Sequence, residues 1–584
     1  MDSSKPPLRR PLSAKFLITA ILALAFGLRL WSVGFGLPHL YHADEPIVVN
    51  HALAYGAGDL HPHFFNIPPL VSYLLFVGYG LYYCAGAVTG IFPALRDFEY
   101  LFYGNPSSFY LIARVIFGVI LGAFSVFLLY RLSRRWGSER EALLSALFLA
   151  VNFLHARDSH YIYVDIPLVF VLLGGFILMF RLFEPVSETR EKEERRFTGW
   201  GRHFVVGAMM GLATAVKYNG VFLLIPYVWI SIRLLSPRQW IRAWLVAGCA
   251  AFLVFVILNP FSALDVDFFL SELREQSAAN QGNFSMFHHL RYSLMGSFTF
   301  VALLLALAGV VKGLFSRDVR RQAISVFIFG YYAVLCRWGQ PYDRYVLPLV
   351  PFLCLTLSDM ILTMNRVWGR KVKGFTFPQI NHKTRVMITS LLVALCLLPP
   401  LLKIVCWNVL MSKPDTRTLA REWIERNIPS RAKVALDREF HGPRLRFTQD
   451  QLREKLPNAT PAQSRRVQAL IEWPREPSYE LYFTAVDLTA SRFLFAQPVV
   501  LRDLEEVKRK GIRWIVTTSA ASPPDDFLLE LENRAVLSAS FSPFRDGRND
   551  AIHDEQILTG GPFLWRDILA RERNGYPILI YELR

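Results

Sequence analysis

Two adjacent acids follow the first long apolar run of the chain, in the segment His42-Ala43-Asp44-Glu45-Pro46. A carboxylate positioned beside a substrate can act as a general base towards a hydroxyl or an amine. Pro46 is also a natural first residue of a helix, so either acid could instead serve as a helix N-cap. Asp44 and Glu45 are therefore candidate catalytic residues, with helix capping as the structural alternative.

A second acidic cluster runs from Arg157-Asp158-Ser159-His160-Tyr161 to Asp165-Ile166-Pro167. Asp165 stands two residues before a proline and can cap the helix that follows. The functional interpretation is that this short loop brings a second acid beside Asp44. Asp158 and His160, together with His42, are candidates for lining the same site.

Two further clusters carry cations that could hold a phosphate. Lys217-Tyr218-Asn219-Gly220 ends an apolar stretch, where a lysine pairs, faces a polar cavity or snorkels to the headgroups. In the segment from Trp338 to Tyr345, Arg344 can hold phosphate oxygens bidentately and Tyr345 can donate a hydrogen bond. A surface pair between Asp343 and Arg344 is the alternative.

Histidines crowd the segment between residues 39 and 63, and His61-Pro62-His63 is the nearest approach to a metal-binding motif. No such spacing stands in a clear helix or strand context. A divalent metal therefore remains an alternative, and no cofactor is firmly predicted.

The elements that must position these residues are membrane-spanning helices. Of the 584 residues, 53% are hydrophobic, and they fall in runs of about twenty, the length of a helix that crosses a bilayer. The six cysteines lie in apolar stretches without a CxxC motif, so we expect them to fill cores. About eleven spans are predicted: 14–34, 111–131, 139–157, 166–183, 203–217, 220–235, 241–259, 293–315, 321–338, 345–364 and 386–407.

The apolar segment 67–92 is also long enough to span, and the distribution of basic residues decides its place. With a cytoplasmic N-terminus and 67–92 lying along the interface, every basic cluster falls in the cytoplasm, where such clusters are normally retained. If 67–92 spans, all of them move outside. The clusters lie at 131–140, 190–202, 233–242, 312–321 and 366–385. This topology accounts for the net charge of +17 without nucleic acid and places all four reactive clusters outside.

The topology predicts two domains. Residues 1–407 form the transmembrane catalytic domain, whose first outer loop, 35–110, is rich in Tyr and Phe and contains interfacial helices. Residues 408–584 have the composition of a soluble, extracytoplasmic α/β domain. Its predicted elements are a helix at 416–427 and strands at 432–437, 512–518 and 577–583.

The run from Gly34-Phe35-Gly36-Leu37-Pro38 to Tyr41-His42-Ala43-Asp44-Glu45-Pro46 resembles the first outer loop of GT-C glycosyltransferases. It is most similar to bacterial and archaeal relatives of the dolichyl-phosphate-mannose protein mannosyltransferases, which also resemble the aminoarabinose transferases of lipid A. Further matches are Gly58-Asp59-Leu60, Pro68-Pro69-Leu70, His160 to Pro167, Lys217-Tyr218-Asn219-Gly220, Arg344-Tyr345 with Pro348, and Asp415-Thr416-Arg417.

The resemblance implies a polytopic α-helical membrane protein of the GT-C type and a role for each matched residue. Asp44 would be the catalytic base with Glu45 beside it, and Asp165 would be the second acid, orienting the acceptor or a bound ion. The donor phosphate would be surrounded by Lys217, Arg344 and Tyr345. The donor would be a sugar on polyprenyl phosphate, dolichyl or undecaprenyl, and the transfer would invert the anomeric carbon.

Two departures separate the chain from the aminoarabinose transferases. Some of those enzymes have an arginine soon after the acidic pair, where this chain has Pro46-Ile47-Val48-Val49. They also have Glu-Lys-Pro before the interfacial helix, where this chain has Asn66-Ile67-Pro68-Pro69. The mannosyltransferase-like branch fits better and leaves the acceptor open as a protein, a lipid or a glycan.

The expected function is thus a hexosyltransferase of the cell inner or cytoplasmic membrane, multi-pass, with its active site and C-terminal domain extracytoplasmic. A secondary transporter is the main alternative, and it predicts ionisable residues near the middle of the membrane, paired repeats and broken helices. A non-catalytic membrane scaffold that presents the outer domain is the third interpretation. Charges at the ends of the predicted spans and the absence of a visible repeat favour the enzyme.

Overall fold

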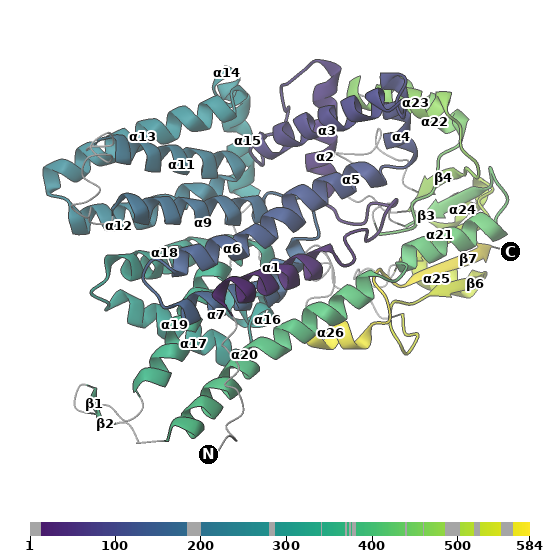
Figure 1. The fold of residues 1–584 in the computed structure, drawn as a ribbon. Helices are drawn as coiled ribbons and strands as arrows, with labels where there is room; N and C mark the ends of the chain where they lie inside the picture. Colours follow the sequence, from purple (N-terminus) through teal and green to yellow (C-terminus); the bar gives the residue numbers. More distant parts are fainter. Residues whose placement is uncertain are drawn as a thin grey trace. The chain divides into compact units, whose positions relative to one another are not determined.

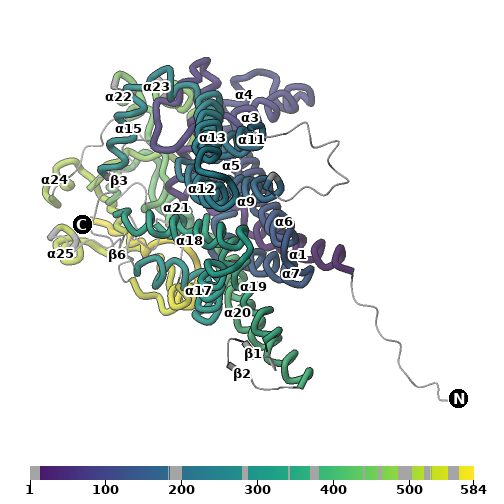
Figure 2. The backbone as a smooth tube through the Cα atoms, turned by 90° about the vertical axis from the view of Figure 1, so that its left-hand side faces the viewer, coloured from purple at the N-terminus to yellow at the C-terminus, as the bar shows by residue number. Residues whose placement is uncertain are grey.

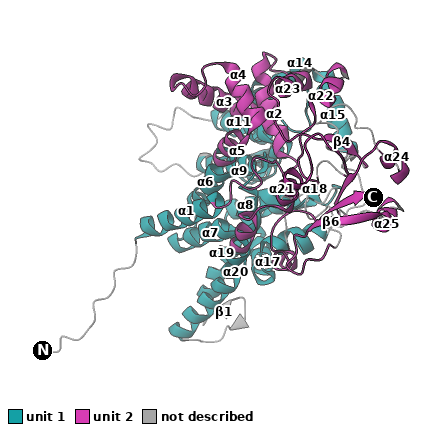
Figure 3. Ribbon diagram, turned by 90° about the vertical axis from the view of Figure 1, so that its right-hand side faces the viewer, with its two compact units in different colours: residues 1–30, 63–70, 116–404 teal, residues 31–62, 71–115, 405–584 magenta. Residues whose placement is uncertain are grey.

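The computed structural model is predominantly helical and divides into two compact units (Figure 3). Unit 1 comprises Met1–Leu30, His63–Leu70 and Ile116–Ile404, and unit 2 comprises Trp31–Pro62, Val71–Val115 and Val405–Arg584. Gln340 and Pro341 of the Arg344 cluster, and residues 184–199 of one basic loop, lie outside the described residues. The structure describes residues 13–183, 200–279, 287–339, 342–367, 371–372, 375–376, 381–437, 441–458, 461–484, 501, 503–518, 526–549 and 564–583.

Unit 1 is built from apolar helices packed side by side (Figures 1 and 2). α11 packs against α13, α17 against α19, α12 against α18, and α6 against both α7 and α9. Its longer helices are α1 (Ala14–Leu30), α6 (Leu121–Ser133), α7 (Glu139–Val151), α9 (Asp165–Leu182), α11 (Trp200–Val216), α12 (Leu224–Leu234), α13 (Pro237–Leu258), α15 (Val266–Ala279), α17 (Phe300–Leu314), α18 (Val319–Leu335), α19 (Val350–Val367) and the unit's part of α20 (His382–Met411).

Small residues allow α11 and α13 to approach closely. A Cβ at Gly207 would lie 2.2 Å from the carbonyl oxygen of Ala247, and one at Gly211 would lie 2.4 Å from that of Ala251. Glycines four residues apart occupy one helix face, and this spacing is typical of close helix packing in membranes. Larger side chains at Gly207 and Gly211 would therefore push α11 and α13 apart.

Each of the predicted spans contains a helix, but several are broken. The span predicted at 139–157 divides at Asn152 into α7 and the short α8 (Phe153–Asp158), and the stretch 203–235 breaks at Lys217. By length and composition alone, five helices of the described part of the chain could cross a membrane, or six if one bent pair counts as a span. Those five are Leu70–Val88, Ser107–Ser133, Pro237–Leu258, Asp343–Val367 and His382–Asn427.

The predicted first outer loop folds into helices within unit 2. They are α2 (Glu45–Ala54), α3 (Leu70–Val88), α4 (Leu95–Gly104) and α5 (Ser107–Ala113). α3 carries an exposed apolar row with helical spacing, which includes Leu74, Val77, Leu81 and Val88. The row gives the helix a lipid-compatible face, and its position along the interface stays a prediction.

All six cysteines are free, but not all fill a core. Cys84 lies in the exposed row of α3, and Cys249 is exposed on α13. The expectation of a core role was wrong for these two, because an apolar sequence context does not distinguish a buried helix face from one that faces outwards.

The C-terminal part of unit 2 contains a five-stranded mixed sheet with the order β4-β3-β5-β7-β6. β3 pairs in parallel with β4 and β5, whereas β7 is antiparallel to β5 and β6. The strands are β3 (Lys433–Leu436), β4 (Glu480–Phe483), β5 (Trp514–Thr518), β6 (Ala535–Phe541) and β7 (Ile578–Leu583).

Alternating side chains bury both faces of this sheet. Val434 and Leu436 pack on one face with Ile424 of α21 (Thr416–Asn427), and Ala435 packs on the other with Val507 of α24 (Leu504–Arg509). The predicted helix and the three predicted strands are all present, so the small α/β fold at the C-terminal end is confirmed.

Candidate functional site

A buried ion pair in unit 1 joins two of the sequence-predicted residues. Lys217 lies in the break between α11 and the 3₁₀ helix η5 (Tyr218–Leu223), with φ −155° and ψ 138°. Its Nζ donates a hydrogen bond of 2.6 Å to Oδ1 of Asp165, and the two side chains are only 10% and 4% exposed. The structure therefore favours pairing of Lys217 over snorkelling, since a buried ammonium is stabilised only by a partner.

Asp165 is the first residue of α9, after the N-cap residue Val164, so it does not itself occupy the capping position. A carboxylate in the first helical turn interacts favourably with the positive end of the helix dipole. Its second oxygen, Oδ2, is buried and has no hydrogen-bond partner among the described residues. A hydroxyl of a bound substrate could donate to this oxygen.

Aromatic rings bring the second cation beside this pair. The guanidinium carbon of Arg344 lies 4.8 Å from the centroid of the Tyr163 ring, and Nζ of Lys217 lies 6.0 Å from the same centroid. Lys217 is also 5.4 Å from the ring of Tyr345, and Arg344 is 4.8 Å from that of Tyr342. These are cation–π distances. The four predicted residues Asp165, Lys217, Arg344 and Tyr345 are thus brought together.

Helix ends add to the positive potential of this cluster. Asp165 begins α9, Lys217 precedes η5, and Arg344 and Tyr345 lie at the start of η7 (Asp343–Leu349), which leads into α19. Helix N-termini carry partial positive charge and bind anions. The cluster thus places the cations of Lys217 and Arg344 beside the carboxylate of Asp165, and Asp158 is close enough to interact electrostatically with Asp165 and Arg344.

Asp343 and Asp158 both lie beside the buried Arg157. Oδ1 of Asp343 accepts a 2.8 Å hydrogen bond from Ser293, and its Oδ2 is 3.9 Å from Arg157, so the alternative of a surface pair with Arg344 is not observed. Nε of Arg157 donates to Asp158 at 2.7 Å. Burial raises the pKa of Asp158 to about 6, against the opposing effect of Arg157.

His160 is buried, and its Nδ1 lies 2.9 Å from the carbonyl oxygen of Ala156 in its own turn. That contact, one helical turn back along the chain, stabilises the turn that connects α8 to Tyr161. Its predicted role in lining the site stays a prediction.

In unit 2, Asp44 occupies the N-cap position of α2, but its side chain makes no capping hydrogen bond. Its backbone N–H donates to Nδ1 of the buried His42 at 3.3 Å. Asp44 therefore does not make the hydrogen bond from its side chain to the first turn of α2 that would define it as a helix cap.

Glu45 is fully buried and engaged by one arginine. Nε and Nη2 of Arg114 donate to its two carboxylate oxygens at 2.7 and 2.6 Å. Nη1 of the same guanidinium donates to the carbonyl oxygens of Val33 and Phe35 at 2.7 and 2.8 Å. These contacts give Glu45 a role in holding the segment that leads to Asp44. Sequence reasoning missed Arg114, which lies 69 residues further along the chain.

The predicted site residues thus form two sets. Asp158, His160, Asp165, Lys217, Arg344 and Tyr345 belong to unit 1, and His42, Asp44 and Glu45 belong to unit 2. That both sets act on one substrate stays a prediction. Within the described ranges, no group of three or more His, Cys, Asp or Glu side chains has the arrangement of a metal site.

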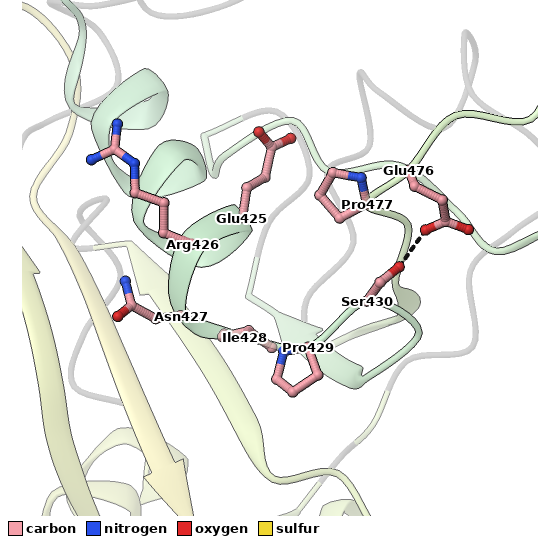
Figure 4. A pocket seen from close by; sticks show the side chains of 8 residues that line it. All are labelled: Glu425, Arg426, Asn427, Ile428, Pro429, Ser430, Glu476 and Pro477. Atoms are coloured by element: carbon pink, nitrogen blue, oxygen red, sulfur yellow. Dashed lines mark hydrogen bonds between the residues drawn. The ribbon is translucent and has the colours of Figure 1, made fainter.

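Unit 2 also has an open pocket of about 580 Å³ between the end of α21 and the turn at Glu476-Pro477. Figure 4 shows Ser430 donating a hydrogen bond to Glu476 at its edge. None of the predicted site residues lines this pocket. The lining residues are Glu425, Arg426, Asn427, Ile428, Pro429, Ser430, Glu476 and Pro477.

Replacement of Lys217 by Met should destabilise the purified protein by about 3 kcal/mol, because Asp165 would stay buried without its partner. The double variant Lys217→Met/Asp165→Asn should recover most of this loss, since it removes both charges. Thermal unfolding of the three proteins in detergent measures the effect. A double variant that is no more stable than Lys217→Met would show that the two charges are not coupled.

Replacement of Glu45 by Gln should also cost about 3 kcal/mol, because it breaks a buried bidentate pair and leaves the Arg114 guanidinium without its counter-charge. Glu99→Gln, on the exposed surface of α4 in the same unit, is the matched control and should unfold like the unaltered protein. Equal thermal stability of both variants would rule out the holding role of Glu45.

The sequence and the fold were compared with those of known proteins. Residues 62–271 match the family described as dolichyl-phosphate-mannose-protein mannosyltransferase. No curated protein matches the chain in sequence.

Two solved structures share the fold at low sequence identity. ArnT from Cupriavidus metallidurans, bound to undecaprenyl phosphate, matches with a TM-score of 0.51 and 13% identity over 97% of this chain and 98% of that one. The archaeal oligosaccharyltransferase AglB from Archaeoglobus fulgidus, in complex with an inhibitory peptide and a dolichol-phosphate, matches with a TM-score of 0.50 and 10% identity over 87% and 69% of the two chains.

These matches confirm the predicted fold class, a helical membrane protein with a small C-terminal sheet domain. The chain has the GT-C fold of membrane glycosyltransferases, and over residues 62–271 it matches the dolichyl-phosphate-mannose-protein mannosyltransferase family.

Proposed function

We propose that this protein transfers a sugar from a polyprenyl-phosphate donor to an acceptor on the non-cytoplasmic side of the membrane, with inversion at the anomeric carbon. The observation that carries the proposal is the buried Lys217–Asp165 pair with Arg344 and Tyr345 beside it at three helix starts. The family match and the lipid phosphates bound by ArnT and AglB support a donor of this class.

The cation cluster suits the leaving group of such a transfer. When the bond between the anomeric carbon and the phosphate oxygen breaks, negative charge develops on the lipid phosphate. Arg344 can hold two of its oxygens with a planar fork, while Lys217 supplies a compact charge and Tyr345 a hydroxyl donor. Hydrogen-bond donors and cations that are already in place lower the activation barrier, because they need no reorganisation during the reaction.

The acceptor requires a base on the opposite side of the sugar. In the proposed reaction, the acceptor oxygen or nitrogen forms its bond to the anomeric carbon as its proton passes to the carboxylate of Asp44. Asp165 holds Lys217 in place, and its Oδ2, which has no hydrogen-bond partner among the described residues, accepts a hydrogen bond from a substrate hydroxyl. Glu45 contributes by fixing the loop through Arg114.

The proposal includes the predicted topology. Residues 1–407 form the membrane-embedded catalytic domain with a cytoplasmic N-terminus, and residues 408–584 form an extracytoplasmic domain. The distribution of basic residues supports this orientation. A secondary transporter also binds its substrate at the ends of broken helices, so the family match over residues 62–271 is what favours an enzyme.

Asp44→Asn should reduce sugar transfer at least about 100-fold with unchanged expression, because the amide cannot accept the acceptor's proton. The assay supplies radiolabelled polyprenyl-phosphate mannose to membranes that contain the protein and follows label in water-soluble and lipid acceptors. Asp267→Asn makes the same chemical change on the exposed first turn of α15 and should transfer at the rate of the unaltered protein. Normal transfer by Asp44→Asn would remove Asp44 from the mechanism.

A further inference from the structure

The first turn of α21 carries a buried arginine that is held by the capping residue of its own helix. Asp415 is the N-cap, and its Oδ1 accepts from the backbone N–H and from Nε of Arg417 at 3.0 and 2.8 Å. Its Oδ2 accepts from Nη2 at 2.9 Å. Both residues are 2% exposed. A bidentate pair of this kind fixes the plane of the guanidinium as well as its position.

The guanidinium of Arg417 contacts the loop that leads to the acidic pair. Its central carbon lies 3.8 Å from the centroid of the Tyr41 ring and 5.5 Å from that of Tyr576. The hydroxyl of Tyr41 is also 2.9 Å from Oγ1 of Thr418, the next residue of the helix. A cation–π contact of this kind is strengthened when it is shielded from water. Tyr41 is therefore held both through its ring and through its hydroxyl.

A second contact lies one helical turn further along. Nη1 of Arg421 donates to Nδ1 of His39 at 3.0 Å. Burial, and after it the charge of Arg421, lowers the pKa of His39 to about 4, so its ring is neutral at pH 7 and can accept this bond. Because Arg417 and Arg421 are four residues apart, they lie on one face of the helix. That face holds both His39 and Tyr41.

The start of α21 is itself fixed by the loop before β7. The backbone N–H of Thr416 donates to the carbonyl oxygen of Asn574 at 3.1 Å, and its Oγ1 donates to that of Tyr576 at 2.7 Å. Gly575 has a φ of +109°, and a Cβ there would lie 2.1 Å from Oγ1 of Thr416. The helix start therefore cannot shift without moving the loop that leads into β7, an interior strand of the sheet.

We propose that Arg417 is a positioning residue for the loop that carries Asp44. This inference rests on the proposed function of Asp44. The loop is anchored on one side by Arg417 through Tyr41 and on the other by Arg114 through Glu45, and Asp44 lies between these two anchors. The C-terminal domain thereby sets the position of the catalytic base, in addition to any part it has in binding the acceptor.

Hydrogen–deuterium exchange on the purified full chain tests the anchor without a substrate. Arg417→Lys keeps the charge but loses the planar fork and the stacking, and Tyr41→Leu keeps an apolar side chain but loses the ring. In both variants the amides of residues 39–45 should exchange about tenfold faster, while those of β3 and β5 stay protected. Arg426→Ala removes a 74% exposed arginine from the same helix and should exchange like the unaltered protein.

If Arg417→Lys exchanges faster throughout unit 2, the comparison of Tyr41→Leu with Tyr41→Phe decides, because only Phe keeps the ring. Faster exchange of residues 39–45 in the Leu variant alone supports the anchor. Equal exchange of residues 39–45 in the Leu and Phe variants overturns the anchor. A folded Arg417→Lys variant whose residues 39–45 exchange at the same rate as in Arg426→Ala also overturns it.

The transfer assay separates this inference from the proposed function. With polyprenyl-phosphate mannose as donor, Arg417→Lys and Tyr41→Leu should lower kcat about tenfold while the KM for the donor changes less than about twofold, since a misplaced base slows chemistry rather than donor binding. If Asp44→Asn abolishes transfer and both anchor variants keep their kcat, only the positioning role fails. If Asp44→Asn transfers normally, the proposed function fails, and the exchange result still decides whether the anchor exists.

Discussion

A charge removed from water must be paired, and this constraint organises every part of the candidate site. Lys217 is held by Asp165, Glu45 by Arg114, and Arg417 by Asp415, each pair largely excluded from solvent. A pair of this kind stabilises little by itself but becomes costly to break, because the remaining charge is left buried. Each pair therefore fixes the position of its two side chains. All three pairs lie at the start of a helix or at the end of a loop.

The ion pairs of the two units have different roles in the proposed transfer reaction. In unit 1, Lys217 and Arg344 are the cations that we propose to hold the phosphate of a lipid donor, and Asp165 fixes the position of Lys217. In unit 2 the two arginine anchors restrain the loop around Asp44 through Glu45 and Tyr41. A half-buried carboxylate between two rigid contacts is suited to receive a proton from an acceptor, which is the role that we propose for it.

Local patterns made most of the fold predictable. Apolar runs of about twenty residues marked the helices, and alternation in segments such as 432–437 marked the strands. The pairing of Lys217 was predictable because a lysine in an apolar stretch needs a partner, and that partner is Asp165. Arg114 lies within the predicted span 111–131, so the same rule could have marked it, but its partner Glu45 is 69 residues away and no local pattern pairs the two. The Arg417–Tyr41 contact was hidden for the same reason, although the Asp415-Thr416-Arg417 motif marked one of its two ends.

Photo-crosslinking with a lipid donor analogue tests the central claim most directly. Undecaprenyl phosphate that carries a diazirine on its first isoprene unit would be irradiated with the full-length protein in lipid nanodiscs, and the labelled peptides would be identified by mass spectrometry. We expect label in the peptide that contains Arg344 and in the peptide that contains residues 41–46, both suppressed by excess undecaprenyl phosphate. Specific label confined to peptides that contain neither segment, or label at Arg344 without label in the loop, would contradict the roles that we propose for Arg344 and Asp44.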